Sequence, residues 1–394
     1  MCSLYDGPLT YAGPIPASAA WREGDNPGRR QFLDVGPLDL EFGGHLPAVR
    51  VAYETFGELN AEGTNAVLIC HALTGDSHVS GPAGPGHLTA GWWDSIVGPG
   101  KALDTNDWFV VCPNILGGCQ GTTGPSSIAP DGQPWGSRWP RITVRDQVEV
   151  ERRVTAALGL TKWAAVIGCS LGGMRSLEWA VTEPNRVGAV LVGVVGAATT
   201  ADQISTHRVQ IDSIKLDPKW RDGDYYDAAP GDGPHAGVGL ARRIAHLTYR
   251  TESELDVRFG RQNQPGADPH ASDDPGFFAV ESYLEHHAQK LARRFDAGTY
   301  VALTDAMSTW DVGRDRGGVA SVLEDVEVPV VVGGVDSDRL FPVRLQHELA
   351  ALLPGDNAAH IIASPYGHDG FLIETEGVGE LVRLTLEKAV SRVG

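Results

Sequence analysis

Positive charge is scarce in this sequence of 394 residues, in which 32 Lys and Arg stand against 50 Asp and Glu, giving a formal net charge of −18. This deficit excludes an extended nucleic-acid or anionic-membrane surface, because such surfaces need an excess of Lys and Arg. Long apolar runs are also missing. The most apolar later run, "VGAVLVGVVGAA", is too short and too rich in glycine to cross a bilayer, so it predicts a buried strand and a turn. We therefore expect neither a nucleic acid nor a membrane as a partner.

Cysteine and metal-binding patterns are sparse as well. The five cysteines form an odd set without a Cys-x-x-Cys pair, and no His-x-x-x-His pair occurs. The first twenty residues contain no Lys or Arg and no sustained apolar core, which is unlike a secretory signal. We therefore predict reduced thiols, a cytoplasmic location and no metal.

Apolar segments and helical patterns alternate along most of the chain. The segments are continuously apolar, which is typical of strands covered on both faces, and their alternation with helices predicts a mostly parallel sheet. The expected strands are 66–71, 108–113, 163–168, 188–196, 328–334 and 359–364; the expected helices are 144–158, 172–182, 342–353 and 375–390. Upstream, the segment that begins with "QFLDVG" predicts an antiparallel pair leading into the sheet.

The strand pattern disappears between about residues 201 and 310, where helical stretches such as "GVGLARRIAHLTYR" take over. The sheet pattern then resumes, so we interpret 201–310 as a helical insertion that acts as a lid, with a polar loop at 262–276. The predicted organisation is a loose N-terminal leader at 1–30 and an α/β core formed by 31–200 and 311–394.

The pentapeptide Gly168–Gly172 (Gly-Cys-Ser-Leu-Gly) lies between an apolar strand and a helix. It fits the Gly-x-Ser-x-Gly nucleophile elbow, in which a strained turn exposes a serine oxygen at the edge of the sheet. Glycine is required on both sides because a Cβ there would collide with neighbouring backbone. Ser170 is therefore the candidate nucleophile; an ordinary Gly-rich turn is the alternative.

A serine nucleophile needs a histidine to accept its proton and a carboxylate to orient that histidine, in the chain order Ser, acid, His. After the strand 328–334 the sequence offers Asp336 and Asp338, and position alone does not choose between them. After the last strand, "SPYGHDGF" offers His368.

Acyl chemistry also needs two donors for an oxyanion. The amide of Leu171, directly after the nucleophile, is one candidate. The amide of Leu73 in "HALTGDS", after an early strand, is the other.

Several motifs together resemble the homoserine O-acetyltransferase family, from about residue 33 to residue 386. They are "HALTGDSH", "GPAGPGH", "GWWD", "NILGGCQGTTGPSS", "WGSRWP", "GCSLGGMRSLEWA", "ARRIAHLTYR", "RFDAGTYVALTDAM" and "YGHDGFLIE". The resemblance implies an α/β-hydrolase fold with an inserted helical lid and a homodimer formed through that lid. It also implies transfer of the acetyl group of acetyl-CoA to the hydroxyl of L-homoserine in methionine biosynthesis, without a permanently bound cofactor.

The same resemblance implies roles for individual residues. The family's nucleophile falls on Ser170, its acid on Asp338 and its histidine on His368. Its substrate-carboxylate arginine falls on Arg242, and its ammonium-binding aspartate falls on Asp369. The sequence departs from the family where Gly-Cys-Ser-Leu-Gly-Gly replaces the usual Gly-Gly-Ser-Met-Gly-Gly, a change that leaves the mechanism intact and bears on acyl-donor or substrate preference.

Three alternatives keep the same fold. A homoserine O-succinyltransferase, or a related acyltransferase acting on serine or deacetylcephalosporin C, would retain every catalytic residue. A hydrolase would release acetate without an acceptor, and a non-catalytic ligand-binding protein would have lost the chemistry.

Overall fold

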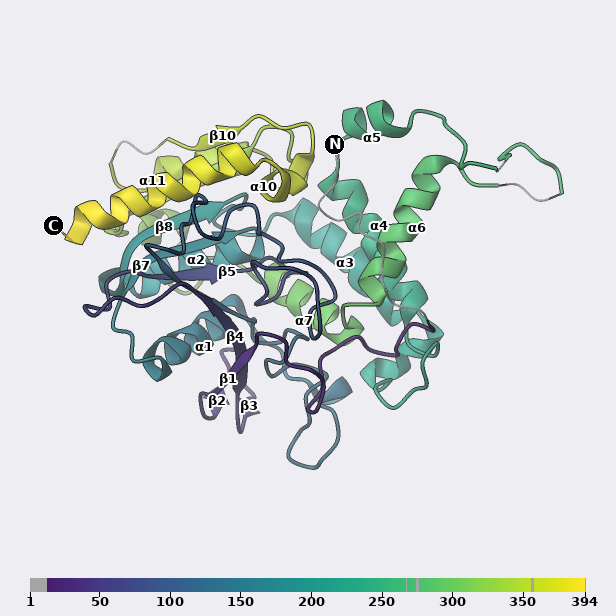
Figure 1. The fold of residues 1–394 in the computed structure, drawn as a ribbon, viewed down its shortest axis with the longest axis horizontal. Helices are drawn as coiled ribbons and strands as arrows, with labels where there is room; N and C mark the ends of the chain where they lie inside the picture. The colour runs from purple at the N-terminus through teal and green to yellow at the C-terminus, as the bar shows by residue number, and fades with distance from the viewer. Residues whose placement is uncertain (1–12, 267, 274–275, 356–357, 394) are drawn as a thin grey trace.

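The fold is built on an eight-stranded sheet in a computed structural model that describes residues 13–266, 268–273, 276–355 and 358–393 (Figure 1). The strand order is β1-β4-β6-β5-β7-β8-β9-β10. Strands β5 to β10 run parallel to one another. At one edge of the sheet, β4 pairs antiparallel with both β6 and β1. The strands are β1 (Gln31–Asp34), β4 (Arg50–Phe56), β5 (Ala66–Cys70), β6 (Phe109–Pro113), β7 (Trp163–Cys169), β8 (Val187–Gly193), β9 (Val330–Val335) and β10 (His360–Ile362).

The predicted strands and the upstream antiparallel pair are thereby confirmed, with small differences at their ends. Strand β8 stops at Gly193 rather than at residue 196 because Val194 takes a positive φ of 44°, which an extended strand cannot hold. A separate hairpin, β2 (Leu38–Asp39) with β3 (His45–Leu46), lies between β1 and β4 in the chain.

Both faces of the sheet are covered by apolar packing. In β5, Leu68 and Cys70 belong to one buried cluster, while Val67 and Ile69 belong to another. Because side chains alternate along a strand, these two clusters lie on opposite faces. The continuous apolar pattern of the strand therefore reflects a core on each side.

Helices from the core segments supply that cover. Helices α1 and α2 lie on one face, and α11 packs on β7, β8 and β9 from the other (Figure 1). The bounds are α1 (Val144–Ala157), α2 (Leu171–Thr182), α8 (Val319–Glu324), α9 (Arg344–Leu352), α10 (Gly370–Ile373) and α11 (Thr375–Val393). The four predicted core helices are found within three residues of their expected ends.

The helical insertion, residues 201–310, lies between β8 and β9 in the chain and to one side of the sheet (Figure 1). Its helices are α3 (Ala201–Lys215), α4 (His235–Tyr249), α5 (Glu252–Phe259), α6 (Ala279–Ala292) and α7 (Ala297–Ser308). Helix α4 packs between α3 and α6, and α7 packs on α3. Part of the predicted polar loop at 262–276 lies outside the described residues, namely 267 and 274–275.

The predicted leader, residues 1–30, is described only from residue 13 onward. Residues 13–30 form no helix or strand, but they are bonded to both parts of the molecule. Ser18 Oγ donates to Asp296 Oδ1 at 2.6 Å in the helical insertion, and Trp21 N donates to the carbonyl of Cys119 at 2.9 Å in the core. The segment thus spans the junction between sheet and insertion.

The four cysteines within the described ranges, Cys70, Cys112, Cys119 and Cys169, are buried and unpaired. Cys2 lies outside the described residues. Burial raises the pKa of Cys119 and of Cys169 to about 12, so both are neutral thiols at ordinary pH. Among the described helices, none combines the length and the apolar character needed to cross a membrane.

Candidate active site

Ser170 occupies the sharp turn between β7 and α2. Its backbone has φ 57° and ψ −127°, a strained conformation for a residue with a side chain. The turn is held by two main-chain hydrogen bonds, from Ser170 N to Gly193 O at 2.9 Å and from Met174 N to Ser170 O at 3.0 Å. The predicted nucleophile elbow is therefore present, with its hydroxyl at the carboxyl edge of the parallel strands.

The two flanking glycines are required by close backbone approach, as expected. A Cβ on Gly168 would overlap the carbonyl of Gly172, and a Cβ on Gly172 would overlap the carbonyl oxygen of Cys70 at the end of β5. Gly193 on the neighbouring strand leaves room for another atom, since a Cβ there would overlap Cys169 Sγ. The cysteine that distinguishes this motif is thus accommodated by a glycine on β8.

His368 connects Ser170 to Asp338. His368 Nε2 lies 3.0 Å from Ser170 Oγ, and His368 Nδ1 lies 2.7 Å from Asp338 Oδ2. Since an ionised carboxylate only accepts, Nδ1–H donates to Asp338 and leaves Nε2 free to accept the serine proton. All three residues are 3–5% exposed. The other oxygen of Asp338 accepts from the amides of Leu340 at 2.8 Å and Phe341 at 2.9 Å, which fixes the carboxylate.

The structure distinguishes Asp336 from Asp338, between which sequence position alone could not choose the acid. Asp338 is buried against His368, whereas Asp336 is exposed and accepts a hydrogen bond from Ser364 N at 3.0 Å. Asp336 therefore joins the turn after β9 to the loop after β10. Within the described residues its carboxylate makes no hydrogen bond to the imidazole.

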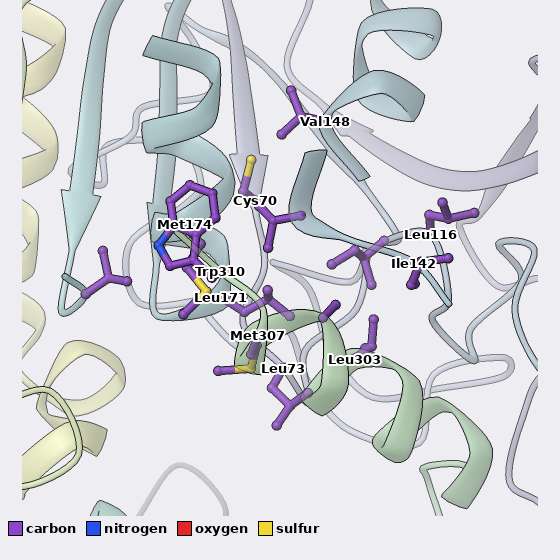
Figure 2. Close-up of a cluster of buried hydrophobic side chains, with 14 of the residues drawn as sticks. Cys70, Leu73, Leu116, Ile142, Val148, Leu171, Met174, Leu303, Met307 and Trp310 are labelled. Carbon is purple, nitrogen blue, oxygen red and sulfur yellow. The ribbon is translucent and has the colours of Figure 1, made fainter. Parts of the chain in front are cut away.

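The two candidate oxyanion donors, Leu73 and Leu171, lie near the elbow. Leu171 is the first residue of α2, so its N–H has no acceptor within the helix. Leu73 follows β5 and lines the same cavity as Ser170. The side chains of both leucines belong to one buried apolar cluster, together with Met307 of α7 (Figure 2).

A cavity of about 630 Å³ opens beside Ser170 and is lined by both the core and the helical insertion. Arg242 of α4 lies in its wall, with its guanidinium carbon 5.6 Å from the centre of the Tyr249 ring. Arg242 Nε is buried without a hydrogen-bond partner among the described residues. A buried N–H of a guanidinium without an acceptor is costly, so this position suits an anionic ligand.

Asp369 also lines the cavity but is paired within the protein. Arg250 Nη1 lies 3.4 Å from Asp369 Oδ2, and Arg250 makes a bidentate pair with Glu254 at 2.6 and 3.1 Å. Arg250 and Glu254 were not expected at the site from the sequence motifs. The sequence does contain a signal for Glu254, because Thr251 and Glu254 have the Thr-x-x-Glu spacing of a helix start. In the structure this spacing starts α5, where Glu254 N donates to Thr251 Oγ1.

A buried cluster of Glu54, His78 and His87 offers three metal-ligand types within the described ranges. Most of its nitrogen and oxygen atoms already have partners: His78 Nδ1 lies 3.0 Å from Glu54 Oε2, and His87 Nε2 accepts from Arg29 N at 3.0 Å. His87 Nδ1 is buried without a partner among the described residues. The two imidazole rings stack 3.8 Å apart with an 11° interplanar angle, so their in-plane lone pairs do not converge. The cluster fits a hydrogen-bonded carboxylate–imidazole group better than a metal site, and the absence of a metal stays a prediction.

The fold and the elbow define a class of protein. A sequence model of the α/β hydrolase fold matches residues 65–375. In structure, the chain is similar to esterase E22, with a TM-score of 0.81 at 25% identity, over 91% of this chain and 99% of that one. The chain belongs to the α/β-hydrolase fold family.

More similar sequences narrow the assignment. Homoserine O-acetyltransferase of Thermobifida fusca (strain YX) is 58% identical over 371 residues, which cover 94% of this chain and 97% of that protein. Homoserine O-acetyltransferase of Clavibacter michiganensis is 56% identical, with coverage of 95% and 97%. The crystal structure of homoserine O-acetyltransferase from Bacillus anthracis matches with a TM-score of 0.82 at 26% identity, over 91% of this chain and 97% of that one. The chain belongs to the homoserine O-acetyltransferase family, which confirms the resemblance found in the sequence.

Proposed function

We propose that this protein transfers the acetyl group of acetyl-CoA to the side-chain hydroxyl of L-homoserine, through an acetyl group carried on Ser170. The observation that supports this most strongly is the 3.0 Å and 2.7 Å chain of contacts from Ser170 through His368 to Asp338. The relatives' common name supports the donor and the acceptor. Methionine biosynthesis is the pathway that this activity serves.

In the first half-reaction Ser170 Oγ attacks the thioester carbonyl while His368 Nε2 takes the hydroxyl proton. The new C–O bond pushes the carbonyl electrons onto oxygen, where the amides of Leu73 and Leu171 stabilise the charge. Collapse breaks the C–S bond, and CoA leaves as a thiol with the proton from His368. The products are free CoA and acetyl-Ser170.

In the second half-reaction the hydroxyl of homoserine takes the place of the thiol. His368 removes its proton, the oxygen attacks acetyl-Ser170, and the proton returns to Ser170 Oγ as the ester bond to the enzyme breaks. Water is the competing acceptor. A cavity closed by the helical insertion would favour transfer over hydrolysis by excluding it.

Homoserine is a zwitterion, so a partly dry cavity needs one fixed charge of each sign to bind it. Arg242 is assigned the carboxylate, and Asp369 is assigned the ammonium group. The contact between Arg250 and Asp369 at 3.4 Å is longer than the bonds between Arg250 and Glu254, which leaves Asp369 able to accept from the ligand.

Further expectations accompany this activity. We expect no permanently bound cofactor or metal, with acetyl-CoA acting as a co-substrate. A homodimer formed through the helical insertion and a cytoplasmic location remain predictions from the sequence.

The function is tested by following free CoA with purified protein and a panel of substrates. Acetyl-CoA with L-homoserine should give O-acetylhomoserine and CoA in equal amounts, and succinyl-CoA, L-serine or deacetylcephalosporin C should be poorer partners. Preference for succinyl-CoA or for another acceptor would overturn the specificity while leaving the serine mechanism standing.

A second candidate, an esterase or thioesterase, is favoured by the structural similarity to esterase E22. The same assay distinguishes it. A transferase releases CoA much faster with homoserine present than without it, whereas a hydrolase releases acetate at the same rate in both cases.

A further inference from the structure

His71, the first residue after β5, is buried and hydrogen-bonded through both ring nitrogens. Ile115 N donates to His71 Nε2 at 3.0 Å, so Nε2 is the unprotonated nitrogen. Nδ1 therefore carries the proton, and it lies 2.8 Å from the carbonyl oxygen of Ala72, to which it donates. Burial, together with the charge of Arg175, lowers the pKa of His71 to about 3, so the neutral form persists across ordinary pH.

The hydrogen bond from His71 fixes the peptide that carries a predicted oxyanion donor. The carbonyl oxygen of Ala72 accepts from His71 Nδ1 and also from Gly75 N, at 2.9 Å. No peptide bond in the described residues is cis. In a trans peptide the N–H points opposite to the C=O, so the two bonds to Ala72 O turn Leu73 N–H away from both donors.

Arg175, one turn along α2 from the nucleophile, is hydrogen-bonded to the same loop. Its guanidinium donates to the carbonyl of His71 and to Glu151 Oε1, and Trp179 Nε1 donates to Glu151 Oε2 at 2.8 Å. Arg175 is fully buried, as is Trp179, and Glu151 is 3% exposed. This network links the helix that begins at the elbow to the loop after β5.

The elbow and the loop after β5 also touch directly. A Cβ on Gly172 would overlap the carbonyl oxygen of Cys70 and would lie 3.3 Å from His71 O. Leu171 N, one residue before Gly172, is thus beside the loop that carries Leu73. Two amides from different elements can serve one oxyanion only if the angle between them is fixed.

We propose that His71 and Arg175 are positioning residues for the oxyanion site: His71 holds the Ala72–Leu73 peptide so that Leu73 N–H faces the acyl oxygen on Ser170, and Arg175 fixes His71. The inference rests on the proposed function for Ser170 and Leu73. It assigns a task to two buried groups, an imidazole and a guanidinium, that take no part in proton transfer.

The test uses a matched pair of variants at one position. Asparagine places an amide nitrogen where Nδ1 of His71 lies, so His71→Asn can still donate to Ala72 O, whereas His71→Leu cannot. The acylation rate is measured as the burst of p-nitrophenol from p-nitrophenyl acetate, which reports acetylation of Ser170 whatever the acceptor. We expect His71→Leu to slow the burst about 100-fold and His71→Asn to remain within about tenfold of the parent.

Two further readouts separate positioning from general damage. The affinity for a trifluoromethyl ketone, whose serine adduct carries an oxyanion, should fall in parallel with the burst rate. The pH profile of the burst should keep its shape, because neither substitution at His71 changes a group that transfers a proton. Arg175→Lys, which keeps the charge beside Glu151 but loses the fork that reaches both partners, should show the same pattern with a smaller loss.

Equal losses in His71→Asn and His71→Leu, or unchanged ketone affinity in both, would overturn the proposal. Should His71→Leu fail to fold, Arg175→Lys carries the test, and unchanged ketone affinity and burst rate there would contradict it. Failure of the proposed transfer reaction looks different: the parent protein would show a burst on Ser170 but no CoA release from acetyl-CoA. A parent protein without any acylation of Ser170 would overturn both.

Discussion

The sheet edge and the helical insertion hold their functional groups by different means. At the sheet edge the main chain holds the nucleophile and the acid: Ser170 N bonds to Gly193 O, and two backbone amides fix Asp338. In the helical insertion side chains hold one another, as in the pair of Arg250 with Glu254. Main-chain contacts survive most substitutions, whereas side-chain pairs change with single residues.

This difference suits two tasks. Covalent chemistry needs reacting atoms placed to within a fraction of an ångström, which strand ends and a tight turn provide. Recognition of a substrate needs charges that can be altered without disturbing the chemistry. We therefore expect substitutions of Ser170, His368 and Asp338 to lower turnover, and substitution of Arg242 in the helical insertion to change substrate affinity first.

Removal of the nucleophile should have the largest effect. Ser170→Ala leaves His368 without a proton to accept and removes the atom that carries the acetyl group. We expect turnover with acetyl-CoA and homoserine to fall by at least 10³-fold and toward about 10⁶-fold. Steady-state assays of CoA release check this, and near-normal turnover in the variant would remove the serine mechanism.

The two aspartates after β9 provide an internal comparison. Asp338→Asn should lower turnover by about 10⁴-fold, because an amide no longer selects the tautomer with the proton on Nδ1. Asp336→Asn should stay close to the parent, since Asp336 is exposed and its carboxylate accepts from Ser364 N in the loop after β10. The kinetics of the two variants are measured side by side, and comparable losses would mean that the acid has been assigned wrongly.

Two neighbouring arginines in the helical insertion test whether this region determines the affinity for homoserine. Arg242→Ala should raise the KM for homoserine by roughly 10- to 100-fold, the value of one charged hydrogen-bonded contact. Arg243→Ala is the control, because Arg243 pairs with Glu285 at the surface. A large fall in turnover for Arg242→Ala at saturating homoserine would contradict the division of tasks.

The smallest effect on turnover is expected from a buried histidine of the helical insertion. Burial lowers the pKa of His207 to about 4, below its value near 6.5 in the unfolded chain. The unfolded state therefore binds the proton first, and stability is lost as pH falls from about 6.5 toward 4.

Glutamine at this position can still bond to Ser308 Oγ, which lies 3.0 Å from His207 Nδ1, but it does not titrate. Between pH 7 and pH 5, His207→Gln should therefore lose about 2 kcal/mol less stability than the parent. Denaturant unfolding at the two pH values measures this, with turnover at pH 7 as the control. Identical pH dependence in both proteins would show that His207 is not held neutral.

Much of the sheet edge was predictable because its signals are local. A glycine on each side of Ser170 and the change from strand to helix specify the elbow, and strand ends specify where His368 must lie. The choice between Asp336 and Asp338 was not predictable from position, because it depends on a turn whose amides at Leu340 and Phe341 select one carboxylate.

Contacts between distant segments were harder to predict. His71 belongs to the motif "HALTGDS", yet its hydrogen bond from Ile115 N depends on the pairing of β5 with β6. A charged helical residue such as Arg175 is usually exposed. Its burial and its pairing with Glu151 depend on the packing of α2 against α1. Side-chain pairs of this kind follow from packing, which periodicity does not encode.

In the proposed mechanism Ser170 carries the acetyl group between donor and acceptor. Mass spectrometry of the intact protein, after acetyl-CoA is added without acceptor, tests it most directly. We expect one added acetyl group, located on Ser170, absent from Ser170→Ala and lost when L-homoserine is supplied. Turnover without any such adduct, or with the acetyl group on another residue, would contradict it.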